Sequence, residues 1–308
     1  MITHMLIAVL CLVWGASWVV IKIGLADSPP FMAATLRFVI AVVFLGALVF
    51  FGRRPQPRGR TTWWRVLAPG VFMYTIPYAS VYYAAPFIPA ALSSVLFATF
   101  PFFVAILAHY YLPGERLDLI KLLGLTGGFL GIVVIFLDGL SLPNPHVIPA
   151  MLLTLLSPAA AALASIWLKK YLSEVDSVSA TFWQMIAGTV FLLPMAFGWE
   201  NPADFRWTFT AVGAAAFLGI FASALAFVIY LHLLKTQEAT RMSLTAFVTP
   251  IVTVILGWIL LGERLGLKTL FGGVLVLGGL FCVLVWAPRR QRRQADVVRT
   301  HNREQRFV

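Results

Sequence analysis

The chain consists of long runs of apolar residues separated by short polar connectors. A bilayer core of about 30 Å is crossed by about 20 apolar residues of helix, whose backbone polar groups are paired within the segment. On this criterion the pattern predicts ten membrane-spanning helices, at approximately 4–24, 31–51, 64–85, 88–112, 119–137, 147–169, 178–198, 208–233, 239–261 and 267–287. The connectors carry helix-breaking residues, as in Asp27-Ser28-Pro29-Pro30. The pattern therefore predicts an all-α integral membrane protein.

Composition and charge support a chain that lies in a bilayer. The 308 residues are 60% hydrophobic and only 11% charged, whereas soluble domains contain about 25% charged residues. The net charge of +11 does not indicate nucleic-acid binding, because the Lys and Arg residues lie in short connectors and a tail instead of on one face of a folded domain. We expect the lipid bilayer as a partner and no nucleic acid.

The distribution of Lys and Arg predicts the orientation. If the N-terminus is cytoplasmic, most of the 23 basic residues fall on the cytoplasmic side, as the positive-inside rule requires. The first apolar run lacks a basic leader and a cleavage box, so we expect a retained span. The prediction is a multi-pass protein of a bacterial-type inner (plasma) membrane with both termini in the cytoplasm.

An internal repeat divides the chain. The motif Gly-Glu-Arg-Leu occurs at 114–117 and again at 262–265, and the two copies are about half the chain length apart. At nearly the same offset, Pro101 of the fourth expected span matches Pro250 of the ninth. Each half then holds five spans, and because five is odd the two copies insert in opposite directions. The expected units are a first repeat at 1–145, a second, inverted repeat at 146–288 and a basic cytoplasmic tail at 289–308.

Three motifs carry a resemblance to a known family. They read WGxSWxxxKxGL at 14–25, ATLRFxxA at 34–41 and PxxxxxLGWILLGERL at 250–265. In order and spacing the chain resembles the ten-helix EamA-type branch of the drug/metabolite transporter superfamily over nearly its whole length. The resemblance implies export of amino acids and related metabolites, as by aromatic amino acid exporters, through a cavity between the halves.

Charged residues within the spans narrow the substrate class. No expected span has an acid near its middle, where proton relays and cation sites usually have one. A lipophilic cation is therefore a less favoured substrate. Lys22 and Arg37 lie near the outer ends of their spans, and we interpret both as snorkelling anchors instead of ligands for a phosphate. A neutral or zwitterionic substrate fits best, exported by alternating access through a central cavity.

Other functions stay open beside this one. Efflux of drugs or toxic compounds by the same fold is the main alternative, and a passive channel or an intramembrane enzyme is a weaker one. No H-E-x-x-H, G-x-S-x-G or G-x-x-x-x-G-K-[ST] motif occurs, so we expect neither catalysis nor a cofactor or metal.

Two kinds of motif supply candidate substrate-binding residues. Aromatic side chains recur at helical spacing in the first and third spans, where core packing or an interfacial belt is the alternative. Pro101 and Pro250 each free the carbonyl four residues back, near Thr99 and Thr249, so an ammonium group could be held there; a structural kink is the alternative. The candidates are Trp14, Ser17, Trp18, Tyr74, Tyr78, Tyr82, Phe97, Thr99, Pro101, Ala246, Thr249 and Pro250.

The repeated acid–base pairs and the glycine-rich spans have structural interpretations. Glu115-Arg116 and Glu263-Arg264 end the fourth and ninth spans, and we expect them to tie each helix end to its neighbour, with a gate as the alternative. Glycines in the fifth and tenth spans allow close helix packing, either within each half or across a homodimer. Both a monomer and a homodimer stay open.

Overall fold

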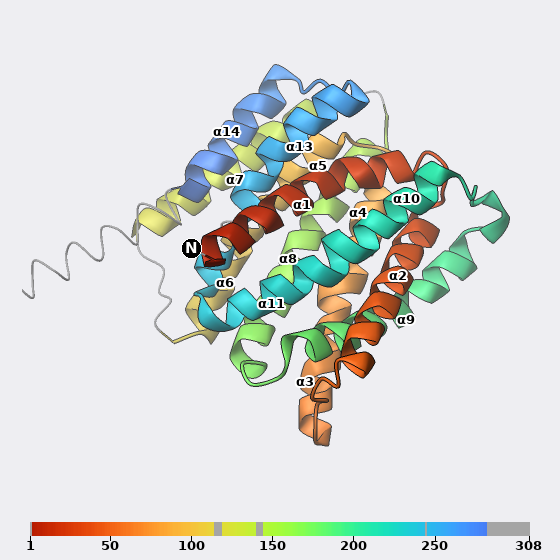
Figure 1. Cartoon of the computed structure of the whole chain (residues 1–308). Coiled ribbons are helices and arrows are strands. Elements are labelled where there is room, and N and C mark those ends of the chain that lie inside the picture. The colour runs from red at the N-terminus through yellow and green to blue at the C-terminus, as the bar shows by residue number, and fades with distance from the viewer. Residues whose placement is uncertain (1, 114–118, 140–143, 244, 282–308) are drawn as a thin grey trace, which may run out of the picture.

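The computed structural model describes residues 2–113, 119–139, 144–243 and 245–281, and every regular element among them is a helix. The all-α prediction is confirmed for this part of the chain. Figure 1 shows the helices packed side by side, with α1 lying across the molecule near α10 and α13. The elements are α1 (Ile2–Gly24), α2 (Pro30–Phe51), α3 (Arg60–Gly70), η1 (Val71–Thr75), α4 (Ile76–Ala84), α5 (Ala90–Phe97), α6 (Phe100–Tyr111), α7 (Leu119–Gly139), α8 (Val147–Tyr171), α9 (Ser177–Trp199), η2 (Pro202–Asp204), α10 (Phe209–Phe217), η3 (Leu218–Leu225), α11 (Ala226–Thr236), α12 (Ala239–Met242), α13 (Thr245–Leu261) and α14 (Leu267–Phe281).

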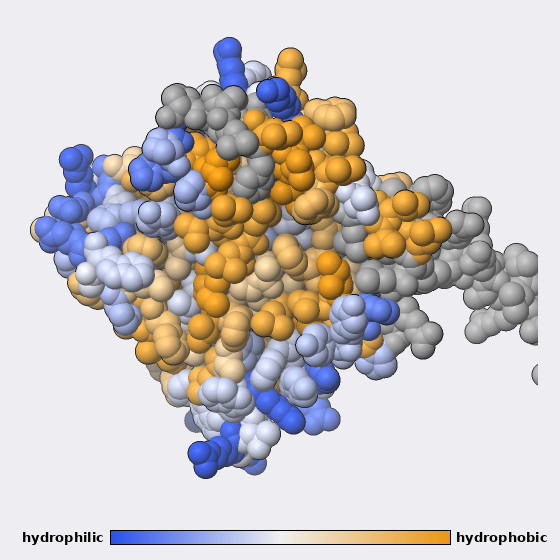
Figure 2. Space-filling view, turned by 180° about the vertical axis from the view of Figure 1, so that it is seen from behind, coloured by the Kyte–Doolittle hydropathy of each residue, from blue (hydrophilic) through white to orange (hydrophobic). Residues whose placement is uncertain are grey.

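Length and composition make several of these helices suitable for crossing a bilayer. Within the described residues, six helices are long and apolar enough: α1, α2, the α5–α6 segment, α8, α9 and the α10–α11 segment. Shorter apolar helices lie at 122–135, 248–261 and 267–279. Figure 2 shows apolar side chains over the middle of one face and hydrophilic ones gathered toward its margins. The chain is therefore a multi-pass membrane protein.

Two of the expected spans contain a π-helical stretch at matching places. η1 begins at Val71 and η3 begins at Leu218. The distance in sequence between these two starts is nearly the same as that between the two Gly-Glu-Arg-Leu motifs. A π-helical turn inserts an extra residue into the backbone and is often found at functional sites. Here each one lies midway between two α-helices that would otherwise be continuous, α3 with α4 and α10 with α11.

The fourth expected span is interrupted instead of merely kinked. α5 ends at Phe97 and α6 begins at Phe100, so Pro101 occupies the first turn of a new helix, a position that tolerates the missing N–H. Pro250 differs, because it lies inside α13. The expectation that each proline lies inside a continuous helix is therefore wrong for Pro101.

Helix packing follows a paired pattern. α1 packs against α13, as α8 packs against α5 and α6. α2 packs against η3, as α9 packs against η1 and α3, while α2 with α9 and α7 with α14 pack as pairs. Each of these contacts has a counterpart with the two halves of the sequence exchanged, which is the pattern expected of a five-element unit that occurs twice.

Glycines bring α7 and α14 close together. A Cβ atom at Gly131 would lie 2.6 Å from the carbonyl oxygen of Gly272, and one at Gly279 would overlap the backbone of Gly124. Such small-residue contacts let helix backbones approach in a membrane, where packing drives association. These glycines therefore pack a helix of the first half against a helix of the second, which corrects the expectation that they pack within each half.

Candidate functional site

A cavity of about 90 Å³ lies between helices of both halves of the chain. α1, α2, α4, α5 and α6 of the first half and α8, α11 and α13 of the second contribute to its wall. The structure brings seven of the twelve candidate residues to this wall: Trp14, Ser17, Trp18, Tyr78, Phe97, Ala246 and Thr249. The cavity is therefore built by segments that are far apart in the sequence.

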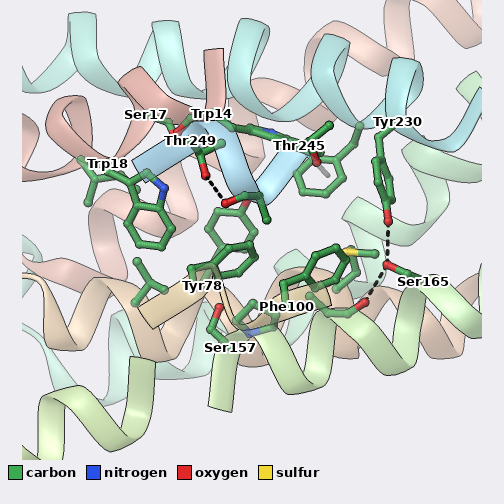
Figure 3. A pocket seen from close by; sticks show the side chains of 18 of the residues that line it. Trp14, Ser17, Trp18, Tyr78, Phe100, Ser157, Ser165, Tyr230, Thr245 and Thr249 are labelled. Atoms are coloured by element: carbon green, nitrogen blue, oxygen red, sulfur yellow. Dashed lines mark hydrogen bonds between the residues drawn. The ribbon is translucent and has the colours of Figure 1, made fainter. Parts of the chain in front are cut away.

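Aromatic rings form much of the cavity wall. Trp14 packs against Phe227 with 5.4 Å between ring centroids and against Tyr230 with 5.5 Å. Trp18 packs against Phe97 at 5.5 Å. Figure 3 shows Trp14 and Trp18 of α1 and Tyr78 of α4 around the same space. Trp14 both packs and lines the cavity, and its indole N–H donates to the carbonyl of Ala222 at 3.2 Å.

Arg37 lies in the cavity wall, which corrects the interpretation of this residue as a snorkelling anchor. Its side chain is buried, with 1% of the residue exposed. Arg37 Nε donates to Ser223 Oγ at 2.7 Å, and its terminal nitrogens make longer bonds of 3.4–3.5 Å to the Tyr78 and Tyr82 hydroxyls and the Ala222 carbonyl. The guanidinium carbon also lies 4.5 Å from the centre of the Tyr78 ring, the geometry of a cation–π contact.

The π-helical stretch η3 supplies two of these partners, Ala222 and Ser223. A Cβ atom at Gly219 would lie 2.7 Å from the Arg37 carbonyl, so this glycine lets η3 approach α2. Arg37 lies seven residues after the start of α2, about 10 Å along the helix axis. That depth was the available signal that Arg37 is not an end-of-helix anchor.

Two of the predicted tyrosines are buried beside the cavity instead of lining it. Tyr74 makes edge contacts with Phe38 and Phe227, with centroids 5.7 and 4.8 Å apart. Tyr82 contacts the residues of the site through its hydrogen bond to Arg37 and its ring contact with Tyr78. Both are 1% exposed, so an interfacial belt explains neither side chain. Of the three tyrosines, Tyr78 alone therefore lines the cavity.

The candidates near the two prolines form local hydrogen bonds. The Thr99 hydroxyl donates to the Leu96 carbonyl at 2.7 Å, and the Thr249 hydroxyl donates to the Ala246 carbonyl at 3.3 Å. The carbonyl freed by Pro250 thus has one partner already, although a carbonyl oxygen accepts two. Thr99, Pro101 and Pro250 are buried but do not line the cavity.

Hydroxyl groups that the sequence reasoning missed complete the wall. Ser157 and Ser165 both face the cavity from α8; their spacing of eight residues, which places them on one helical face, was the available signal. Ser165 Oγ accepts from the Tyr230 hydroxyl at 2.9 Å (Figure 3). The Ser157 hydroxyl is buried and finds no hydrogen-bond partner among the described residues.

Glu263 lies outside the cavity and joins three segments. Its carboxylate accepts from the backbone N–H groups of Ala90 at 2.9 Å and Ala91 at 3.2 Å, at the start of α5. Lys22 at the end of α1 completes the contact, with Nζ 3.0 Å from Glu263 Oε1. Lys22, in the last turn of α1, is therefore paired with an acid. Arg264 is exposed.

The equivalent pair Glu115-Arg116 lies outside the described residues. Lys169, the counterpart of Lys22 in the second half, donates to the carbonyls of Leu234 at 2.9 Å and Gln237 at 2.6 Å. Lys22 likewise donates to the carbonyl of Ile88 at 3.0 Å. The two lysines therefore make similar contacts, because each binds carbonyl oxygens near the end of another helical segment.

Comparison with known proteins gives matches over most of the chain. The model of the EamA-like transporter family matches twice, at residues 1–137 and 148–285. Two uncharacterized transporters of Bacillus subtilis are similar: YvbV is 29% identical over 294 residues, which cover 95% of this chain and 94% of that protein, and YoaV is 26% identical over 270 residues, 88% and 92%. An uncharacterized transporter of Archaeoglobus fulgidus is 30% identical over 271 residues, 88% and 94%. A solved crystal structure has a TM-score of 0.70 and 16% identity over 93% of this chain and 98% of that one, a likeness that shows the fold alone.

Proposed function

Because the chain belongs to the EamA-like transporter family, we propose that this membrane transporter exports amino acids or similar neutral or zwitterionic metabolites from the cytoplasm. It is a secondary transporter of a bacterial-type inner membrane with both termini in the cytoplasm. Substrate reaches the cavity from alternate sides as the two halves move against each other. Family membership points to transport instead of catalysis.

The architecture that we propose is ten membrane-spanning helices in two inverted repeats of five. The two separate matches of the family model support it, and so does the exchange pattern of helix contacts. The matching positions of η1 and η3 add a third, local sign of the repeat. Two repeats that each contain an odd number of spans insert with opposite topology. In transporters built in this way the site lies between the halves, near the bilayer midplane.

The observation that carries the proposal is the cavity between the two halves. Its aromatic rings suit an apolar side chain, and the hydroxyls of Ser17, Ser157 and Thr249 suit small polar groups. No Asp or Glu occurs among the described lining residues. Ligand sites of this kind are largely apolar with a few polar groups that fix orientation, and a free cation would lack a counter-charge there.

Efflux of drugs or toxic compounds is the second candidate function, and the aromatic wall is the observation that favours it. An aromatic surface also binds larger apolar molecules. The two functions differ in what they transport, because an amino acid exporter requires the polar ends that all amino acids share, whereas a drug exporter does not.

The test is uptake of a panel of labelled amino acids into proteoliposomes, with and without a pH gradient. We expect saturable uptake of at least one amino acid with a neutral side chain, absent from protein-free liposomes. Competition by unlabelled amino acids and failure of lipophilic drugs to compete supports metabolite export. Drug competition together with no amino acid uptake would instead favour efflux of toxic compounds.

A further inference from the structure

We propose that Arg37 is the carboxylate-binding residue of the cavity, so that the substrates are carboxylic acids with an apolar or aromatic body. The inference rests on the proposed function, since it names the chemical group by which that site recognises its substrate. It concerns a residue that sequence reasoning had placed at the membrane surface, and its basis is the burial and the partners of the guanidinium.

The charge on Arg37 is buried without a counter-charge among the described residues. Arg37 is 1% exposed, and its hydrogen-bond partners are three hydroxyls and one carbonyl, all neutral. The two ion pairs found in the described residues involve other side chains, Lys22 with Glu263 and Arg54 with Asp176. A buried charge is costly unless it is paired, and charged residues within membrane spans usually mark a substrate or ion pathway.

The hydrogen bonds of Arg37 leave its outer edge available to a ligand. Nε is held firmly, 2.7 Å from Ser223 Oγ, which fixes the position of the group. The bonds from the two terminal nitrogens are 3.4–3.5 Å long, beyond the usual 2.7–3.2 Å range for N–H···O bonds. Those nitrogens can therefore exchange weak neutral partners for the two oxygens of a carboxylate, which matches the fork of a guanidinium.

The Tyr78 ring lies against the guanidinium of Arg37. The centre of the ring lies 4.5 Å from the Arg37 guanidinium carbon, and such a cation–π contact favours the buried cation without neutralising its charge. Arg37 and Tyr78 both line the cavity, so a carboxylate bound there would leave the rest of the molecule among the aromatic rings. Ser157, with its unpartnered hydroxyl in the same wall, offers a further polar contact.

The affinity of the cavity for a ligand should therefore depend on the ligand's charged end. An acid gains the Arg37 contact, whereas an ester or amide of the same body does not, and an amine without a carboxylate is repelled. A single guanidinium suits a monoanionic carboxylate better than a dianionic phosphate. Amino acids and simple carboxylic acids share this chemistry, and a matched ligand series separates them.

The experiment measures ligand-induced stabilisation of the purified full-length protein in lipid nanodiscs. The probes are L-phenylalanine, L-phenylalanine methyl ester, 3-phenylpropionate and phenethylamine, with a matching leucine series. We expect the acids to raise the unfolding temperature in a saturable way, because a ligand that binds only the folded protein stabilises it. Equal stabilisation by 3-phenylpropionate and L-phenylalanine would mean that the protein recognises the carboxylate alone. Stronger stabilisation by L-phenylalanine would mean that the ammonium group also contributes to binding. Both results support the inference.

Variants at position 37 test the residue itself. Arg37→Gln should weaken acid binding about 10- to 100-fold, the usual effect of losing a charge-assisted contact, and should leave binding of the esters unchanged. Arg37→Lys should retain the preference for acids with reduced affinity, because it keeps the charge and loses the fork. A merely structural role for Arg37 would lower the unfolding temperature without ligand and weaken all ligands equally, which would overturn the inference.

The outcomes also separate this inference from the proposed function. If amino acids are transported but esters and amines stabilise the protein as well as acids do, the carboxylate inference is wrong and the transporter proposal stands. If acids bind through Arg37 but no amino acid is transported, amino acid export is wrong and the carboxylate site stands. Absence of stabilisation by every acid in the unmodified protein contradicts the inference.

Discussion

Replacement of Glu263 by alanine should destabilise the protein measurably without touching the cavity. The Glu263 carboxylate accepts hydrogen bonds from the first two N–H groups of α5 and pairs with Lys22. Glu263→Ala removes all three contacts at once. Two backbone donors at a helix start then lose their acceptor, and helix N-termini favour a negative charge at this place.

The contacts and burial of Glu263 determine the size of this effect. Loss of a capping side chain costs about 1 kcal/mol and up to about 2 kcal/mol, and the Glu263 side chain is only 9% exposed, which places its contacts toward the upper end. Lys22 is 30% exposed and keeps its bond to the Ile88 carbonyl, so loss of the ion pair adds only about 0.5–1 kcal/mol. The expected total is about 2–3 kcal/mol, or roughly 5 °C or more in unfolding temperature.

The assay is thermal unfolding of purified protein in nanodiscs, with Glu263→Gln as the graded variant. The amide oxygen of glutamine can still accept one N–H bond but forms no ion pair, so its effect should be about half that of alanine. Arg264→Ala is the matched control, because the neighbouring side chain is exposed. If Glu263→Ala melts no lower than Arg264→Ala, Glu263 does not stabilise the joint between α1, α5 and α13.

Three further predictions concern the site, the topology and the packing. Tyr78→Ala should reduce transport about tenfold by removing the ring under the Arg37 guanidinium, while Tyr78→Phe should retain most activity; unchanged uptake kinetics in the alanine variant would remove Tyr78 from the site. Cysteines placed one at a time at the exposed positions 58 and 203, in a chain free of other cysteines, should react with an impermeant maleimide from opposite sides of the membrane; labelling from the same side would refute the inverted repeat. Gly131→Ala should lower stability by about 1–3 kcal/mol because its Cβ would overlap the Gly272 carbonyl, whereas Gly127→Ala on the same helix meets nothing within 4 Å and should be tolerated; equal unfolding temperatures would contradict the α7–α14 packing.

Much of the fold could be predicted because apolar run length and helix-breaking residues are local properties. The expected ranges of the first, second, sixth and seventh spans agree with α1, α2, α8 and α9 to within a few residues. The interruption before Pro101 and the π-helical stretches η1 and η3 could not be predicted. They depend on which backbone hydrogen bond forms at each turn, and packing against other helices decides that.

The site was predicted less completely, for a related reason. Spacing along one helix placed Trp14, Trp18 and Tyr78 on faces that do reach the cavity. It could not show that Arg37 faces Ser223, because that contact joins α2 to η3 across 186 positions of sequence. Ser157 and Ser165 were missed since serine in an apolar helix usually bonds its own backbone, as Ser165 does to the Ala161 carbonyl.

The central claim is that substrate crosses the membrane through the cavity between the two halves. Counterflow in proteoliposomes tests it most directly, with the labelled amino acid that gives the strongest uptake and with Ala161→Phe, which introduces a ring into the cavity wall, as the blocked variant. We expect saturable uptake that unlabelled substrate inside the liposomes accelerates, and loss of this uptake in the folded Ala161→Phe protein. Uptake that rises linearly with concentration, or that persists unchanged in Ala161→Phe, would contradict it.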